Sequence, residues 1–134
     1  MNSLFPDICT HKLNESKAFY TSLFGLDTVF EIDWYVQLKS PYDENLQIAF
    51  VDIHHDSVPK THQKPSQGVV VTVESESVDD LYHKAKDLKL PIIMDLCDEV
   101  WGQRHFMTED PNGLLVDIYK TIEPSPSFME QYVV

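Results

Sequence analysis

The sequence predicts an α+β fold made of two tandem βαβββ modules. Two observations carry this prediction. The order of one strand, one helix and three strands occurs twice along the chain, and a polar segment without apolar periodicity separates the two occurrences. A length of 134 residues with 43% hydrophobic content fits one compact domain better than two. We therefore expect a single domain over residues 1–121.

The first module covers about residues 4–53. A short strand at Leu4–Thr10 precedes a helix that Asn14 can cap, and Gly25 ends that helix in the usual C-terminal position. Phe19 and Leu23 have helical spacing within it. Three β-rich runs follow, at Thr28–Ile32, Trp34–Lys39 and Leu46–Ile53.

Residues 54–67 form the linker, because they combine prolines and histidines with no apolar periodicity. The second module, about residues 68–121, begins with a valine-rich strand at Gly68–Glu74, followed by a helix that starts near Ser77 and ends before Pro91. Its remaining strands are predicted at Ile92–Leu96, Gln103–Glu109 and Leu114–Thr121. Residues 122–134 form a tail, docked or disordered, whose apolar end offers an assembly surface.

The turn EDPNG before the last strand is the best-specified local feature. Pro111 presets φ at the first central position, and Gly113 supplies the positive φ of a bulged hairpin. In the strand that follows, Val116 and Ile118 face one side, and Asp117 faces the other. A carboxylate projecting from a packed strand makes Asp117 the first candidate for chemistry.

Charge and composition limit the partners. A formal net charge of −12 opposes polyphosphate and anionic membrane surfaces, so we expect neither nucleic acid nor membrane as a partner. The same charge either favours cationic ligands or only keeps the protein soluble. The start of the chain lacks a secretory signal, which predicts a cytoplasmic protein. Cys9 and Cys97 have no metal-type spacing and are interpreted as two buried thiols.

The helix sequence FYTSLFGL, together with WGQR and DPNGLLVDI, resembles the vicinal oxygen chelate superfamily. That superfamily contains glyoxalase I, extradiol dioxygenases, fosfomycin-resistance enzymes and bleomycin-resistance proteins. The resemblance spans about residues 4–121. It implies that the two modules form a curved mixed sheet around a cavity, with the helices on the outer face, and that the protein is a homodimer.

Metal-dependent members of that superfamily take one ligand from each of four strands. The resemblance places these positions at Phe5, at Ala49 or one residue to either side, at Gly68 or Val69, and at Asp117. Only Asp117 offers a side-chain donor. We therefore expect no metal and no other cofactor in the usual site. An alternative is an unconventional site in which His105, Asp117 and Asp7 together bind a divalent ion.

Candidate ligand-binding residues follow from the implied cavity. Period-two spacing from Phe5 puts Asp7 on the same strand face, where it either joins Asp117 in the cavity or lies solvated at the rim. Strand aromatic residues supply apolar walls or belong to the core, and glutamines on neighbouring strands can orient a polar ligand. The full set is Phe5, Asp7, Trp34, Gln37, Phe50, Trp101, Gln103, His105, Asp117 and Tyr119.

The leading functional hypothesis is a metal-free, bleomycin-resistance-like protein that binds a small organic molecule, cationic and aromatic, in an acidic cavity. The alternative is a superfamily enzyme that acts on a small carbonyl or peroxy compound, with Asp117 as the base or in an altered metal site. A third interpretation is a subunit with a vestigial cavity and a role in assembly. The sequence does not decide whether the protein is an enzyme.

Overall fold

The computed structural model describes residues 1–132 and divides them into two compact units. The first unit contains residues 1–68 and 110–113, and the second contains residues 69–109 and the chain from 114 onward. Elements of the first unit are β1 (Asp7–Thr10), α1 (Leu13–Phe24), β2 (Asp27–Ile32), β3 (Tyr35–Lys39), β4 (Gln47–Asp52) and the 3-10 turn η1 (Lys60–His62). Elements of the second unit are β5 (Val70–Glu74), α2 (Val78–Asp87), β6 (Ile92–Glu99), β7 (Gln103–Glu109), β8 (Leu115–Thr121) and α3 (Pro126–Tyr132).

Each unit contains one four-stranded mixed sheet. The strand order is β1-β4-β3-β2 in the first and β5-β8-β7-β6 in the second. In both, the first strand of the module pairs in parallel with the last, and the other pairs are antiparallel. The predicted α+β fold of tandem βαβββ modules is confirmed.

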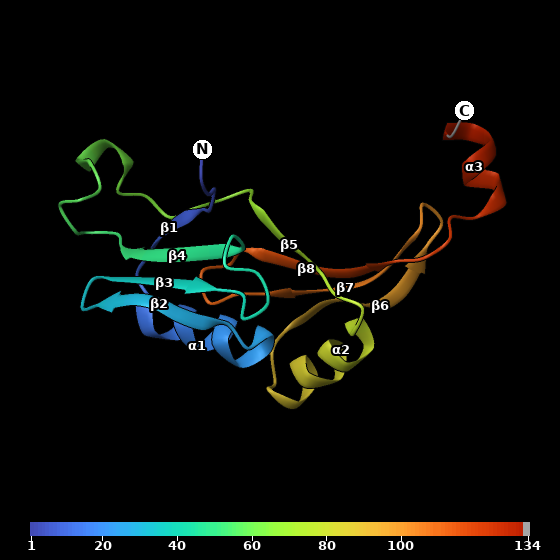
Figure 1. The fold of residues 1–134 in the computed structure, drawn as a ribbon, viewed down its shortest axis with the longest axis horizontal. Helices are drawn as coiled ribbons and strands as arrows, with labels where there is room; N and C mark the ends of the chain where they lie inside the picture. Colours follow the sequence, from blue (N-terminus) through green and yellow to red (C-terminus); the bar gives the residue numbers. More distant parts are fainter. Residues whose placement is uncertain (133–134) are drawn as a thin grey trace. The chain divides into compact units, whose positions relative to one another are not determined.

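The first core lies between α1 and one face of the first sheet (Figure 1). Tyr20 and Leu23 are spaced to share one helix face and are almost fully buried, and the Tyr20 ring lies 5.2 Å from that of Phe50. Gly25 ends α1 with φ +66° and donates its N–H to the Thr21 carbonyl, as predicted. Asn14 is not the cap, because the helix already begins at Leu13.

The second core repeats this plan with α2. Val78 and Ala85 of the helix are fully buried, and the Tyr82 ring contacts Phe106 of β7 at 5.2 Å. Val116 and Ile118 of β8 are fully buried as well, as their alternation predicted. The face of each sheet that lies away from its helix is called the helix-free face below.

Two strand boundaries differ from the prediction by three residues, and the others by two or fewer. Leu4 to Pro6 lie outside β1, because pairing with β4 begins only at Asp7. Strand β6 continues three residues past Leu96, through Cys97 to Glu99, because register shifts keep it paired with β7 along this length. This extension determines which side chains meet His105.

The DPNG turn belongs to the first unit. Tyr20 Oη donates a 2.8 Å hydrogen bond to Asp110 Oδ2, and both residues are buried. The Asn112 side chain donates to Ser16 Oγ at 2.9 Å and accepts a bond from Thr10 Oγ1. These contacts attach the turn to β1 and α1.

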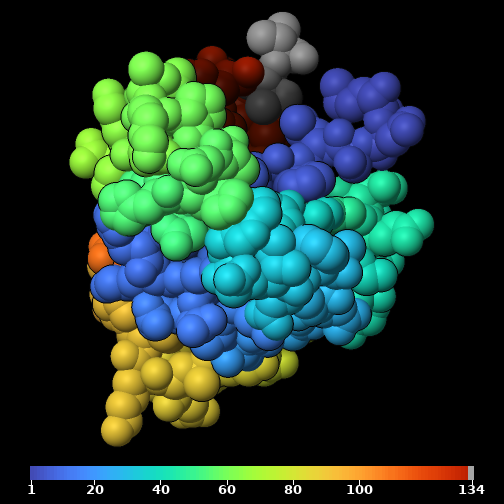
Figure 2. All heavy atoms as spheres, turned by 90° about the vertical axis from the view of Figure 1, so that its left-hand side faces the viewer, coloured from blue at the N-terminus to red at the C-terminus, as the bar shows by residue number. Residues whose placement is uncertain are grey.

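The segment between β4 and β5 packs beside the β2–β3 hairpin, as the green and cyan surfaces in Figure 2 show. The His55 ring from this segment stacks on Trp34 at 3.5 Å with a 2° interplanar angle.

In the second unit, α3 extends past the end of β8, with Met129 and Tyr132 exposed. Val133 and Val134, part of the predicted apolar tail, lie outside the described residues. No described helix has the length and apolar character needed to cross a bilayer.

Candidate functional site

The second sheet carries a cluster of polar and aromatic side chains on its helix-free face. Because successive strand residues alternate, burial of Phe106 and Ile118 against α2 puts His105, Asp117 and Tyr119 on the opposite face. Cross-strand pairing brings Cys97 and Tyr119 opposite His105 on its two neighbouring strands. The members of the cluster are Glu74, Cys97, Glu99, Trp101, Gln103, His105, Asp117 and Tyr119.

His105 is the centre of the cluster. Its Nδ1 lies 2.8 Å from Asp117 Oδ1, and the residue is only 2% exposed. An ionised carboxylate only accepts hydrogen bonds, so in a ring with one proton that proton lies on Nδ1 and Nε2 presents its lone pair. Nε2 is a buried atom without a hydrogen-bond partner among the described residues. Asp117 therefore orients the imidazole, and one of its oxygens is occupied in doing so.

Glu99 and Cys97 lie in front of this imidazole. Glu99 Oε2 is 3.4 Å from His105 Nε2, and Cys97 Sγ is 3.8 Å from Glu99 Oε1. Cys97 is a free thiol, and partial burial together with the Glu99 carboxylate raises its pKa. Thiol, carboxylate and imidazole donors all lie within 4.8 Å of one another.

Trp101 and Tyr119 supply the aromatic part of the face. Trp101 is 45% exposed; its indole N–H donates to Gln103 Oε1 at 2.9 Å, and its ring meets that of His105 edge-on at 6.3 Å. Tyr119 Oη donates to Glu74 Oε2 at 3.0 Å, which raises the tyrosine pKa. The face thus combines an accessible indole with fixed carboxylates.

The basic residues of these strands lie on the other face. Arg104 contacts Asp79 through a 2.9 Å and a 3.1 Å hydrogen bond and Asp98 through a 2.8 Å bond. The Arg104 hydrogen bond is the main cause of the lowered Asp79 pKa, and the charge of Lys120, on the same face as Arg104, contributes less. In the described part of the chain, no ion pair joins Glu74 or Asp117 to a lysine or arginine. The helix-free face therefore keeps its negative charge.

The predicted residues of the first unit form a more dispersed set. Asp7 is surface-exposed, yet partial desolvation raises its pKa. The pKa values of Cys9 and Tyr35 are also raised, mainly by desolvation and to a smaller extent by the Asp7 charge. The Tyr35 hydroxyl donates to Gln37 Oε1 at 3.0 Å. Asp7, Cys9, Tyr35 and Gln37 thus mark the helix-free face of the first sheet.

Three other predicted residues of the first unit lie elsewhere. Phe50 is fully buried against Tyr20 on the helix side and belongs to the core. Trp34 lies in the β2–β3 turn beneath His55, and Phe5 is half-buried ahead of β1. None of these three lies in the polar cluster of either helix-free face.

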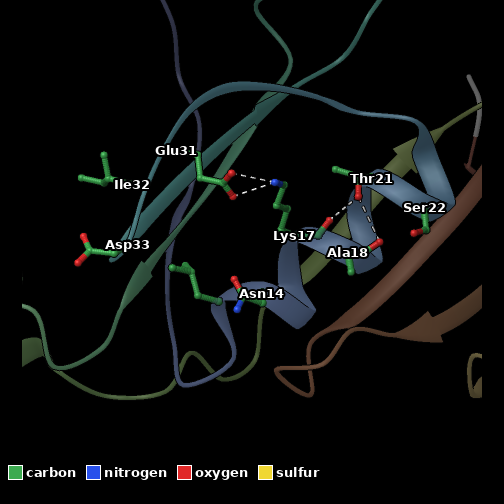
Figure 3. Close-up of a pocket in the computed structure, with 9 residues that line it drawn as sticks. Asn14, Lys17, Ala18, Thr21, Ser22, Glu31, Ile32 and Asp33 are labelled. Carbon is green, nitrogen blue, oxygen red and sulfur yellow. Dashed lines mark hydrogen bonds and ion pairs between the residues drawn. The ribbon is translucent and has the colours of Figure 1, made fainter.

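A groove of about 570 Å³ lies on the helix side of the first unit, between α1 and β2. Lys17 crosses it to Glu31 in an ion pair of 2.8 Å, and Thr21 bonds back to its own helix (Figure 3). Lys17 and Glu31 already neutralise each other, and the residues that line the groove include no histidine or cysteine. We therefore take the cluster around His105 as the candidate site.

The four positions that the family resemblance assigns to a metal do not fit one. Phe5 and Ala49 have hydrocarbon side chains, and Gly68 has none; Ala49 is also fully buried. Asp117, the remaining position, bonds His105. One oxygen donor does not hold a catalytic divalent ion, so no chemistry is derived from a metal at those positions.

Sequence reasoning found His105, Asp117, Tyr119, Trp101 and Gln103, and the structure brings these five together. It missed Glu99 and Cys97, because β6 was expected to end at Leu96. It also missed Glu74, which the parallel pairing of β5 with β8 places beside Tyr119. The carboxylate at the end of β5 was therefore the available signal.

Solved structures with the same fold include proteins of several activities. A glyoxalase/bleomycin resistance protein/dioxygenase from Nocardioides is 21% identical, with 94% of this chain and 87% of that chain covered and a TM-score of 0.71. A lactoylglutathione lyase from Agrobacterium tumefaciens is 19% identical, with coverage of 90% and 94% and a TM-score of 0.69. The antibiotic binding protein TnmS3 from Streptomyces sp. CB03234 is 16% identical, with coverage of 90% and 96% and a TM-score of 0.71.

At these identities the structural likeness establishes the fold alone. No curated protein sequence matches this chain significantly. The sequence does match one protein family, described as the Glyoxalase/Bleomycin resistance protein/Dioxygenase superfamily, over residues 4–118. The chain therefore belongs to the glyoxalase/bleomycin resistance protein/dioxygenase superfamily.

Proposed function

We propose that this protein binds a small organic cation with an aromatic group on the helix-free face of its second sheet. The supporting observation is the pair of carboxylates, Glu74 and Asp117, that lie on the same face of the second sheet as the exposed indole of Trp101, whereas Arg104 pairs with acids on the other face. A cation is attracted to both kinds of group, to carboxylates by charge and to an indole by its π face.

The hydrogen bonds on this face favour binding without rearrangement. Tyr119 fixes Glu74, His105 fixes Asp117, and Gln103 fixes the Trp101 indole. Groups that are already oriented lose little conformational entropy when a ligand arrives. The net charge of −12 adds a long-range attraction for cations.

Because Cys9 and Cys97 are both free thiols, which suits a reducing compartment, we also propose a cytoplasmic location.

The test compares two probes that share a benzyl group, at the same concentration and on chelator-treated protein: benzyltrimethylammonium and uncharged benzyl alcohol. At ten times its Kd, a ligand stabilises the native state by about 1.4 kcal/mol, which raises Tm by about 5 °C for a chain of this length. We expect this shift with the ammonium probe and little with the alcohol. Equal effects of the two probes, or none, would contradict the proposal.

Variants locate the site. Trp101→Ala removes the exposed ring, and Glu74→Gln removes one charge without changing side-chain size, so each should weaken ammonium binding several-fold. Glu123→Gln is the matched control, because this exposed carboxylate of the same unit follows β8 and lies outside the cluster. Equal weakening in Glu123→Gln would mean that only net charge matters.

A further inference from the structure

We propose that Cys97, Glu99 and His105 form a binding site for one zinc-class divalent ion. The three residues lie in one unit, on the paired strands β6 and β7, and their donor atoms are within 4.8 Å of one another. This set shares no residue with the four positions at which the superfamily resemblance places a metal. The inference does not rest on the proposed function.

The unpartnered imidazole nitrogen points to a ligand. His105 is 2% exposed, and its buried Nε2 has no hydrogen-bond partner among the described residues. A buried polar atom without a partner destabilises the folded state, so the protein gains stability when a ligand binds that atom. Nε2 also presents its lone pair, because the Asp117 carboxylate holds the proton on Nδ1.

The distances match a tetrahedral ion. With Zn–N and Zn–O bonds of about 2.1 Å, nitrogen and oxygen ligands lie about 3.4 Å apart, and a thiolate sulfur lies about 3.6 Å from the oxygen. His105 Nε2 and Glu99 Oε2 are 3.4 Å apart, and Cys97 Sγ is 3.8 Å from the other oxygen of Glu99. All donor atoms lie within 4.8 Å of one another, so side-chain movements of about 1 Å close the site around an ion.

A proton on Nε2 is the competing occupant. However, the 3.4 Å between Nε2 and Glu99 Oε2 is longer than a usual N–H···O hydrogen bond. A hydrogen bond between these two atoms would also leave the position of Cys97 beside them unexplained. A sulfur, a nitrogen and an oxygen together suit zinc and disfavour Mg²⁺ and Ca²⁺, which take oxygen ligands. The geometry therefore fits the metal better than the proton.

The surroundings also suit a metal. Asp117 bonds the far nitrogen of His105, as in the carboxylate–histidine–metal arrangement that fixes the orientation of the ring. Glu99 has a side chain that is 24% exposed, so an ion can enter from its side. Three protein ligands leave the fourth position to water. Thiolate and carboxylate neutralise the ion, so Glu74 and Asp117 keep their charge for an organic cation.

The experiment uses the full chain after chelator treatment and gel filtration. Calorimetric titration with ZnCl₂ and elemental analysis are expected to give one ion per chain, and Co²⁺ is expected to give thiolate-to-cobalt charge-transfer absorption. Cys97→Ser should abolish that absorption and weaken zinc binding, and Cys9→Ser, which changes the only other thiol, should change neither. Asp117→Asn should weaken zinc binding by about 10–100-fold and keep the cobalt absorption.

Glu99→Gln provides a second variant at the more exposed ligand and should weaken zinc binding as well. Melting curves of the metal-free variants check that each is folded. Absence of stoichiometric zinc in the wild-type protein, or wild-type affinity in folded Cys97→Ser, would overturn the proposal. The ammonium titrations are made in chelator, so failure of one proposal leaves the other to be judged separately.

Discussion

Replacing Tyr20 by phenylalanine tests how the DPNG turn is attached to the first unit. The substitution removes one hydroxyl and leaves the ring that packs against Phe50. That hydroxyl donates a 2.8 Å hydrogen bond to the Asp110 carboxylate, and the two residues are 2% and 4% exposed. Burial, followed by the Asp110 charge, raises the pKa of Tyr20, so the hydroxyl stays a donor.

The magnitude follows from this environment. A hydrogen bond to a charged group contributes about 1.5–3 kcal/mol, and burial of both partners excludes water as a ready substitute. We therefore expect Tyr20→Phe to lower the free energy of unfolding by about 2 kcal/mol. With an unfolding entropy of about 0.28 kcal/mol/K for 134 residues, Tm should fall by about 7 °C.

Calorimetry and urea denaturation at pH 7 measure both quantities. Tyr42→Phe is the matched control, because Tyr42 is 96% exposed and its hydroxyl is free to bond water; its stability should be unchanged. If Tyr20→Phe were as stable as Tyr42→Phe, the buried hydrogen bond would not hold the turn and this reasoning would be refuted.

Three further substitutions test particular contacts. Asp7→Asn should stabilise the protein at neutral pH, because the raised Asp7 pKa means that folding disfavours the ionised carboxylate. The gain in stability should appear as the pH rises from the usual 3.8 through the raised pKa, and denaturation at a series of pH values measures it. Gly102→Ala should cost about 1–3 kcal/mol, because φ is +103° and a Cβ would lie 2.9 Å from the Ile122 carbonyl oxygen; Gly68→Ala, with open space around it, should cost less in the same melts. Asn112→Ala should lower stability by about 1–2 kcal/mol in urea denaturation, because two hydroxyl partners lose their bonds.

The sequence predicted those elements whose periodicity and turn chemistry agree. The bounds of β7 are as predicted, and the alternation after Gly113 placed Asp117 and Ile118 on the correct faces. Helix α2 starts after Ser77 as expected, although the Ser77 side chain makes no capping bond. Local pattern is sufficient where each strand has one apolar face.

The remaining features depend on contacts between distant residues. Strand β6 extends to Glu99 because β7 pairs with it, and no apolar alternation marks its last three residues. The bond between Tyr20 and Asp110 joins residues 90 positions apart, which no local pattern reveals. Phe50 was assigned to a cavity among other strand aromatics, and the neighbouring Tyr20 ring makes it core.

An NMR titration of the chelator-treated protein with benzyltrimethylammonium tests the central claim most directly. The account predicts saturable shifts at the Trp101 indole N–H and at the backbone amides of Glu74 and Tyr119, with no comparable change around Lys17 in the helix-side groove of the first unit. Shifts confined to that groove, or spread evenly over the acidic surface, would contradict it.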